Sequence, residues 1–524
     1  MTPCKETENI RVVKAAWVVG LSTLLSRIFG FIRDMVIAGF FGAGLATDAF
    51  FVAFRIPNLL RRLFAEGSLT IAFIPVFTGY LKRSKKQAVE FAGIAFTLLS
   101  IILALVSVAG IVFSPWIVRI MAPGFSEVPD KYALTVFLTR LMFPYIFFIS
   151  LVALCMGILN SFRHFAAPAL APVVLNICMI TSAFLLKDYF EVPILSLAVG
   201  VMAGGVLQLA MQFPFLLRVG ARLRPSLRFD HPGIKKIGIL MLPAVFGAAV
   251  YQASIFINTI LASLLPGGSV SYLYYADRVV QLPLGVFAMA VGTASLPSFS
   301  EQMAEGNYDE LKDTISFSLR VILFVTIPAM VALIALRVPI ISVLFQRGQF
   351  DVASTVFTAS ALLYYAVGLW AFSCIRVVVS AYYAMQDTRT PVKIAVAALF
   401  VNVIMSIVLM FPMKHNGLAL ATSIASAVNI VALAMILRKR VGKFLEKNFW
   451  ISMFKTILAS VIMWVSIAAV THVLGWNSEG GFGERLLFLV VAILVGLAVF
   501  VLSSIILGSS EARILLRMKS RQNI

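Results

Sequence analysis

The sequence predicts an all-α polytopic membrane protein, on three observations. Of its 524 residues, 61% are hydrophobic and only 13% are charged, which is too few charges for the surface of a soluble chain of this length. Apolar runs longer than the roughly 18 residues that mark a spanning helix recur along the whole chain. Backbone groups in lipid must pair internally, so such runs form helices or a closed barrel. Their length and uniformity favour helices over the alternating ~10-residue strands of a barrel.

Taken in order, the apolar runs predict about 14 transmembrane helices with soft boundaries. They fall at 14–41, 47–80, 88–121, 132–160, 166–187, 192–217, 236–264, 270–299, 312–336, 354–385, 391–412, 416–437, 449–473 and 485–508. Several exceed about 20 residues, so these must tilt, kink or project beyond the bilayer. The apolar segment 337–350 is too short to span, and we expect it at the interface.

The connections between the spans alternate in charge. One set of loops, which includes both ends of the chain, carries 26 Lys and Arg, and the opposite set carries six. Because cytoplasmic loops are enriched in basic residues, both termini and the loops at 81–87, 218–235 and 438–447 are predicted to be cytoplasmic. The same loops account for most of the net charge of +20, so we expect no nucleic-acid partner.

Two halves of the chain share a pattern. Aromatic-x-Ala-x-Arg, followed by Ala-x-Ile/Leu-Pro-x-Phe, occurs at 51–55 and 72–77 and again at 274–278 and 294–299, offset by 223 and 222 residues. A polar pair beginning at Asn160 recurs from Gln386 with an offset of 226. These matches predict a duplication, with a duplication kept only for packing as the alternative.

The offset covers six spans, an even number, so the halves should share orientation. We therefore expect two six-helix bundles related by a pseudo-two-fold axis along the membrane normal, an architecture of transporters. The predicted division is an N-terminal bundle at 1–217 and a C-terminal bundle at 218–447 that includes the basic loop before it. Two additional helices and a basic tail follow at 448–524.

Ionisable residues lie within the first, second and eighth predicted spans. A charge at the bilayer centre costs at least about 2.5–3.5 kcal/mol, so it faces a cavity or a partner. The residues are Arg27, Arg33, Asp34, Asp48, Arg55, Arg61, Arg62, Glu66, Asp277 and Arg278. Arginines outnumber carboxylates by two, and a guanidinium grips phosphate oxygens with two hydrogen bonds. The set predicts a cavity for an anion such as a phosphate or diphosphate. A simple pairing of Arg62 with Glu66, four residues away, is the favoured reading of those two.

Four N-terminal motifs carry a resemblance to a known family. The run SRIFGFIRD at 26–34, with TDAFFVAF at 47–54, PNLLRR at 57–62 and FAEG at 64–67, resembles the MurJ (MviN) lipid II flippases. These belong to the multidrug/oligosaccharidyl-lipid/polysaccharide exporter superfamily. The resemblance covers essentially the whole chain. It implies a multi-pass protein of the bacterial inner membrane that moves an undecaprenyl-diphosphate-linked peptidoglycan precursor, lipid II, from the cytoplasmic to the periplasmic leaflet by alternating access.

The resemblance also implies roles for particular residues. Essential cavity arginines of the family fall on Arg27, Arg33, Arg61 and Arg278, which we expect to bind substrate. Acidic partners fall on Asp34, Asp48 and Glu66, and the pattern of buried charges adds Arg55, Arg62 and Asp277 as cavity or gating residues. Spans 1 and 8 are the expected lateral gate, because Ser22, Ser26 and Gly30 form a smooth strip and Pro283 and Gly285 interrupt the eighth span.

No cofactor or metal is expected from the sequence, since the four cysteines and four histidines share no ligand spacing. Some relatives bind sodium between the seventh, eleventh and twelfth spans, but here the seventh span has Asn258 and no carboxylate, so no sodium site is assigned. Coupling to the membrane potential or to a cation stays open. The expected partners are lipid II and membrane lipids, with the cell-wall synthesis machinery left open.

Three other functions were weighed against a flippase. A cation-coupled exporter of drugs or of another lipid-linked oligosaccharide shares the architecture, but an exporter of cationic drugs would need acidic residues in its cavity. A membrane-embedded transferase would need a group of catalytic carboxylates or histidines. ATP hydrolysis is a separate alternative, and the absence of a Walker A pattern argues against it. An enzyme is therefore not expected. Arginines inside the spans argue against a structural scaffold.

Overall fold

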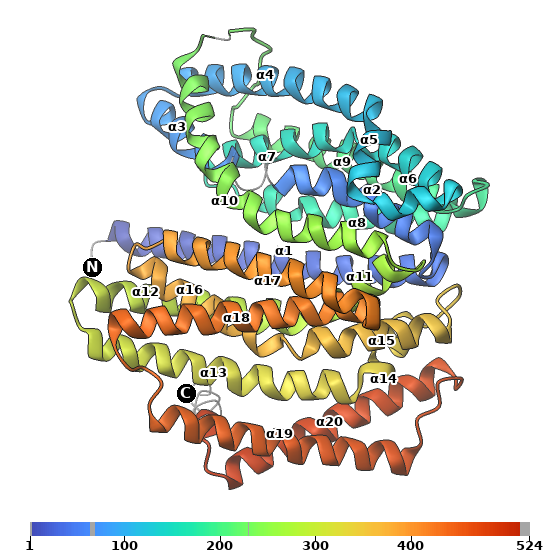
Figure 1. The fold of residues 1–524 in the computed structure, drawn as a ribbon. Helices are drawn as coiled ribbons and strands as arrows, with labels where there is room; N and C mark the ends of the chain where they lie inside the picture. The colour runs from blue at the N-terminus through green and yellow to red at the C-terminus, as the bar shows by residue number, and fades with distance from the viewer. Residues whose placement is uncertain (1–2, 63–68, 229, 514–524) are drawn as a thin grey trace. The chain divides into compact units, whose positions relative to one another are not determined.

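Figure 1 shows the computed structural model, which describes residues 3–62, 69–228 and 230–513. Within these ranges the chain is helical throughout and has no β-strand. The chain divides into two compact units, Met1–Gly268 and Ser269–Ile524, each of which is taken by itself below. The prediction of an all-α protein is confirmed.

The first unit begins with a 39-residue helix and continues with shorter ones. Its helices are α1 (Pro3–Phe41), α2 (Leu45–Leu60), α3 (Thr70–Arg83), α4 (Lys85–Val112), α5 (Ser114–Met121), α6 (Pro129–Met142), α7 (Tyr145–Ser161), α8 (Ala166–Leu186), α9 (Leu195–Arg218) and α10 (Pro232–Ser263). Short 3₁₀ turns, η2 (Pro123–Glu127) and η3 (Lys187–Tyr189), follow α5 and α8. Helix α10 packs against α3 and lies within this unit. The predicted division of the repeat into bundles at 1–217 and 218–447 stays a prediction.

The second unit starts with a helix broken by a π-helical turn. Its elements are α11 (Ser269–Pro283), the π turn η4 (Leu284–Ala288), α12 (Met289–Ala304), α13 (Tyr308–Ala335), α14 (Arg337–Phe345), α15 (Val352–Ala366), α16 (Leu369–Ala384), α17 (Arg389–Met413), α18 (His415–Val441), α19 (Lys447–Leu474) and α20 (Phe482–Ile506). The short segment at 337–350 forms the nine-residue helix α14, which packs against α15 and α20.

Helix boundaries recur along the chain with one offset. Helix α13 begins and ends 223 residues after α4, and the pair α15–α16 spans the residues 223 beyond the pair α6–α7. A π-helical turn begins at Arg61 in one half and at Leu284 in the other, again 223 apart. These boundaries support the predicted duplication, and they do so independently of the sequence motifs.

Left-handed backbone positions fix the register of that repeat. Arg163 (φ 60°) and Gln386 (φ 57°) both follow the end of a helix, 223 residues apart, in the conformation that commonly ends helices. The predicted pairing of Asn160 with Gln386 at an offset of 226 was therefore wrong by three residues. The polar side chains suggested an offset of 226, but the left-handed turns repeat at an offset of 223.

Nine helices among the described residues are long and apolar enough to cross a membrane. The pair α15–α16, bent by 41° at its break, makes a tenth if it is counted as one span. The other four predicted spans coincide with α1, α2–α3, α10 and α11–α12. Two of these four contain a proline within or at the end of a helix, Pro57 in α2 and Pro283 in α11, where proline removes an intrahelical donor and clashes with the preceding turn.

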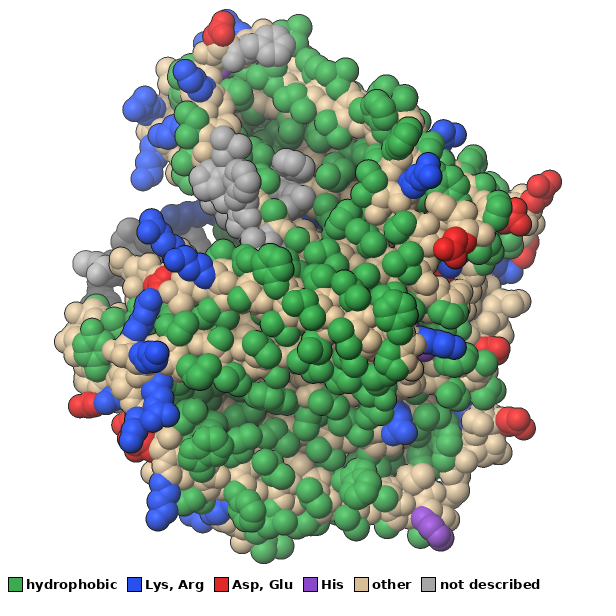
Figure 2. Space-filling view, in the orientation of Figure 1, with side chains coloured by type: hydrophobic (Ala, Val, Ile, Leu, Met, Phe, Trp, Pro, Cys, Tyr) green, Lys and Arg blue, Asp and Glu red, His purple; other side chains and the backbone are tan. Residues whose placement is uncertain are grey.

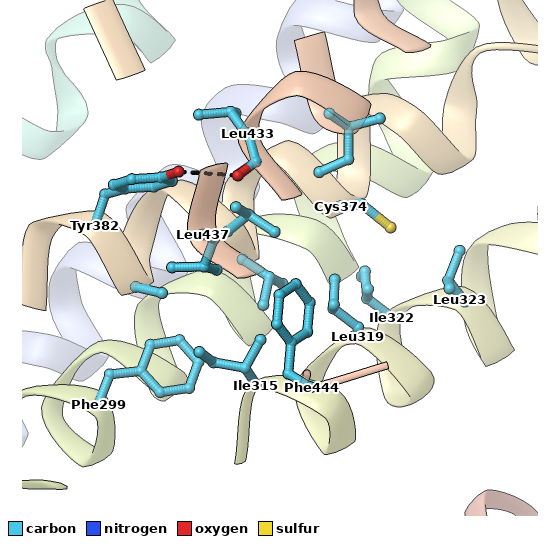
Figure 3. Close-up of a cluster of buried hydrophobic side chains, with 14 of the residues drawn as sticks. Phe299, Ile315, Leu319, Ile322, Leu323, Cys374, Tyr382, Leu433, Leu437 and Phe444 are labelled. Carbon is cyan, nitrogen blue, oxygen red and sulfur yellow. Dashed lines mark hydrogen bonds between the residues drawn. The ribbon is translucent and has the colours of Figure 1, made fainter. Parts of the chain in front are cut away.

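A buried cluster in the second unit joins α12, α13, α16 and α18. Figure 3 shows Phe299, Ile315 and Leu437 packed together among its side chains. The hydroxyl of Tyr382, a fully buried residue, donates a hydrogen bond of 2.8 Å to the carbonyl of Leu433. A buried tyrosine needs such an acceptor, so this bond fixes α16 against α18.

Candidate functional site

A buried ion pair lies on α1. The Nε and Nη2 atoms of Arg33 donate to the same Oδ1 of Asp34, at 3.0 and 2.7 Å, and Nη1 donates to Oδ1 of Asn176 on α8 at 3.0 Å. Arg33 is 5% exposed and Asp34 1%. Asn176 also donates to the carbonyl of Ser26 at 3.2 Å. The network therefore ties two turns of α1 to α8. The contact of Asn176 with α1 was not predicted, because the sequence does not show which helix lies opposite α1.

The small-residue strip of α1 faces the same neighbour. A Cβ atom added to Gly30 would lie 3.4 Å from Nδ2 of Asn176, and Ser22 is buried. In the first unit the helix that approaches this strip is α8, which is the fifth predicted span. The predicted lateral gate between the first and eighth spans stays a prediction. Arg27 lies on the exposed side of α1, near the exposed Leu24 and Ile28.

A second buried ion pair stands at the start of α2. Oδ2 of Asp48 accepts from Nζ of Lys131 on α6 at 2.7 Å and from the backbone N–H of Gly268 at 2.7 Å. The Lys131 ammonium also lies 4.0 Å from the ring centroid of Phe125. The carboxylate lies in the first turn of α2, where the helix dipole favours a negative charge. Lys131 is one of the six basic residues of the less basic set of connections, and its role as the partner of Asp48 was not predicted.

The remaining charges of α2 are less buried. Nη1 of Arg55, which is half-buried, donates to Oγ1 of Thr259 on α10 at 2.5 Å. Arg61 is half-buried and Arg62 is exposed, and both lie in the π-helical turn after α2. Glu66 lies outside the described residues, so its pairing with Arg62 stays a prediction.

In the second unit, Arg278 is half-buried on α11. Its Nε and Nη2 atoms lie 3.3 and 3.2 Å from the hydroxyl of Tyr274, one turn earlier, and its guanidinium lies 5.3 Å from the centroid of that ring. The neighbouring Asp277 accepts a hydrogen bond from Gln281. Tyr274 was seen only as part of the repeated motif. Arg27, Arg33 and Arg61 belong to the first unit and Arg278 to the second, so their convergence on one cavity stays a prediction.

The described residues contain no group of three or more His, Cys, Asp and Glu side chains that could hold an ion. What they do contain is paired charge inside apolar helices, and such pairs are costly unless they serve a cavity or a change of state.

The fold defines a class, that of membrane transporters built like the MATE multidrug resistance transporters. An inward-facing multidrug resistance transporter of the MATE family, of the MOP superfamily, has the same fold with a TM-score of 0.67 at 14% identity, over 82% of this chain and 99% of that chain. A solved lipid II flippase MurJ, in an inward closed conformation, is more similar, with a TM-score of 0.78 at 28% identity over 93% and 98% of the two chains.

Sequence relatives give the family. The family model "Lipid II flippase MurJ" matches residues 37–505. A probable lipid II flippase MurJ of Buchnera aphidicola subsp. Schizaphis graminum is 38% identical over 95% of this chain and 97% of its own length. Another, from Vibrio cholerae, is 34% identical over 96% and 97%. The chain belongs to the MurJ family of lipid II flippases, as the resemblance predicted, and it is a multi-pass membrane protein.

Proposed function

We propose that the protein moves lipid II from the cytoplasmic to the periplasmic leaflet of the bacterial inner membrane by alternating access. Relatives named lipid II flippases match it over nearly its whole length. The observation in the molecule that carries the proposal is the set of arginines on apolar helices, since an anionic headgroup crossing a bilayer needs fixed positive charge at membrane depth.

In this mechanism Arg27, Arg33 and Arg278 hold the substrate diphosphate, and Arg61 joins them as the cavity opens. The fork of each guanidinium matches phosphate oxygens, whereas a lysine would offer a point charge. Arg33 supports a release step, because Asp34 and Asn176 already engage three of its nitrogens. A carboxylate that takes up the fork in one state competes with phosphate, so binding and release alternate with the state of the ion pair. We propose the same competing role for Asp48.

The expected orientation in the membrane follows from the charge of the loops. Both termini lie in the cytoplasm, and the partners are lipid II and membrane lipids. The two bundles at 1–217 and 218–447 move around the substrate, with the helices after 448 outside the repeat. The protein carries out transport and no chemical step, needs no cofactor, and takes its driving force from the membrane potential or a cation. A reporter fused after Ile524 that reads as periplasmic would contradict this orientation.

The decisive experiment measures transport in vesicles that contain the purified protein. Lipid II is detected separately in each leaflet and compared with the same lipid lacking its diphosphate and with another undecaprenyl-diphosphate-linked oligosaccharide. Rapid flipping of lipid II with slow flipping of the lipid without diphosphate is expected. Equal rates for these two would contradict diphosphate recognition, and faster flipping of the other oligosaccharide would assign a different substrate.

A further inference from the structure

A cavity of about 310 Å³ opens in the second unit where α13 and α19 begin. Figure 2 shows Lys and Arg side chains gathered at this end of α13, α18 and α19, which is the end predicted to be cytoplasmic. Around the cavity α13 changes from polar residues at 308–316 to an apolar run from Val321 onward. The cavity therefore lies at the level where lipid phosphates meet the hydrocarbon.

Positive charge lines one part of this cavity. Arg320, whose side chain is 22% exposed, has its nearest carboxylate oxygen, on the buried Glu511, at 3.4 Å. Its Nε atom is buried and has no hydrogen-bond acceptor among the described residues. Lys312, two turns earlier, also lines the cavity and pairs with the exposed Asp309 at 2.5 Å. The rest of the Arg320 guanidinium is partly exposed and lines the cavity, and a charge-assisted hydrogen bond from it to a ligand oxygen would be favourable.

The start of α19 adds further donors. This 28-residue helix begins at Lys447 after Glu446, whose side chain makes no capping hydrogen bond, and Asn448 in its first turn lines the cavity. The first backbone N–H groups of a helix have no partner within it, and the dipole makes this end favourable for anions. Together, Arg320, Lys312 and the N-terminal end of α19 form a site suited to binding a tetrahedral oxyanion.

Acidic groups line the cavity as well. Asp313 and Glu446 are both exposed carboxylates on its wall, so the ligand carries a positive group beside its negative one. Phe317, also on the wall, is 37% exposed on a transmembrane helix and offers apolar surface to a chain that leaves the cavity into the bilayer. The volume is far too small for a disaccharide with a peptide.

We propose that this cavity binds the phosphoethanolamine headgroup of a membrane phospholipid in the cytoplasmic leaflet. Arg320, Lys312 and the start of α19 hold the phosphodiester, and Asp313 and Glu446 hold the ammonium. None of the arginines assigned to transport above lines this cavity. A phospholipid bound here would therefore be a structural or regulatory ligand and not the transported substrate.

The test is a lipid titration of the delipidated full-length protein by native mass spectrometry. Phosphatidylethanolamine is expected to bind about tenfold more tightly than phosphatidylglycerol, which has no amine, and Lys312→Gln is expected to weaken it about tenfold, the value of one charge-assisted hydrogen bond. Asp313→Asn should weaken only the amine lipid. Arg320 is removed together with Glu511, as Arg320→Gln/Glu511→Gln, so that no unpaired charge stays buried.

Lys447→Gln is the matched control, because Lys447 is exposed in the first turn of α19 and does not line the cavity. It should leave the affinity unchanged. The proposal is overturned if phosphatidylglycerol binds as tightly, if Lys447→Gln weakens binding as much as Lys312→Gln, or if soluble glycerophosphoethanolamine displaces the lipid at equal concentration. If the double variant fails to fold, Lys312→Gln and Asp313→Asn decide the matter alone.

Discussion

The two halves of the chain share helix boundaries but not charges. With the offset of 223 residues, Arg33 and Asp34 of α1 correspond to Phe256 and Ile257 of α10, and Asp48 corresponds to Ser271. The second half thus forms the same helices without the buried ion pairs of the first. The fold does not require those pairs, which favours the interpretation that they serve transport. Arg55 and Arg278 are the exception, an arginine in both halves.

The largest expected effect tests this interpretation directly. Changing Arg27 or Arg278 to Ala should abolish lipid II flipping while the protein remains in the membrane, because the diphosphate loses a bidentate partner at depth. Changing either to Lys should impair flipping less, since the charge stays and the fork is lost. Leaflet-resolved transport and membrane abundance are measured together. Normal flipping by both Ala variants would show that these arginines are only structural. The difference in charge between the two halves would then be unrelated to transport.

A double substitution that removes both charges separates a role of Arg33 in transport from a role in packing α1 against α8. Arg33→Ala alone removes the guanidinium that pairs with the buried Asp34, so it should abolish flipping and also destabilise the protein by about 3–5 kcal/mol. Replacing the pair with its counterparts, as Arg33→Phe/Asp34→Ile, should recover much of the thermal stability without flipping. Transport by this double variant at the normal rate would show that the pair only packs α1 against α8.

The ion pair of Asp48 with Lys131 should affect stability more than transport. Lys131→Met removes the ammonium that pairs with the buried Asp48 carboxylate, and a cost of about 3–5 kcal/mol is expected. The double variant Asp48→Ser/Lys131→Ser, which matches Ser271 and Ser354 of the second half, should cost less. Thermal unfolding in detergent measures both. A double variant less stable than Lys131→Met would mean that the carboxylate is held by more than this pair.

The smallest expected effect is on stability and concerns Asp387, in the loop between α16 and α17 of the second half. Asp387 accepts hydrogen bonds from the backbone N–H of Thr390, at 2.9 Å, and from Arg440, at 2.5 Å. The bonds from Thr390, followed by that from Arg440, lower the pKa of Asp387 well below its ordinary value. A carboxylate with a lowered folded-state pKa stabilises the protein above its unfolded-state pKa, about 4, and loses that contribution as the pH falls further.

Asp387→Asn measures that contribution. At neutral pH the variant should be less stable by about 1 kcal/mol, since the bonds to Arg440 and the helix start weaken and the site is partly exposed. The difference from the unaltered protein should shrink below pH 4. Glu305→Gln, a change at another exposed loop carboxylate, is the control. A difference that stays constant down to pH 3 would show that charge is not involved.

Hydropathy and basic-residue bias were enough to predict the helices, and the motifs were enough to predict the family. The partners of the charges were not predictable, because a sequence gives the spacing along one helix and not the helix that lies opposite. Asn176, Lys131 and Thr259 come from α8, α6 and α10, up to 204 residues from the charge they contact. The pairing of Asn160 with Gln386 failed for a similar reason, since a left-handed turn at Arg163 leaves little trace in side-chain type, whereas the motif at 51–55 and 274–278 had the correct offset of 223.

Each half carries a wider turn midway along its second span, at Arg61 and at Leu284–Ala288. A π-helical turn holds one more residue than an α-helical turn over the same rise, and it often occurs at functional sites. If such a turn relaxed to α-helix, the stretch beyond it would rotate by about 100°. Arg61 and Arg62 lie on the first of these turns, so one residue of winding is enough to swing a guanidinium from one side of its helix to another while neighbouring helices stay in place.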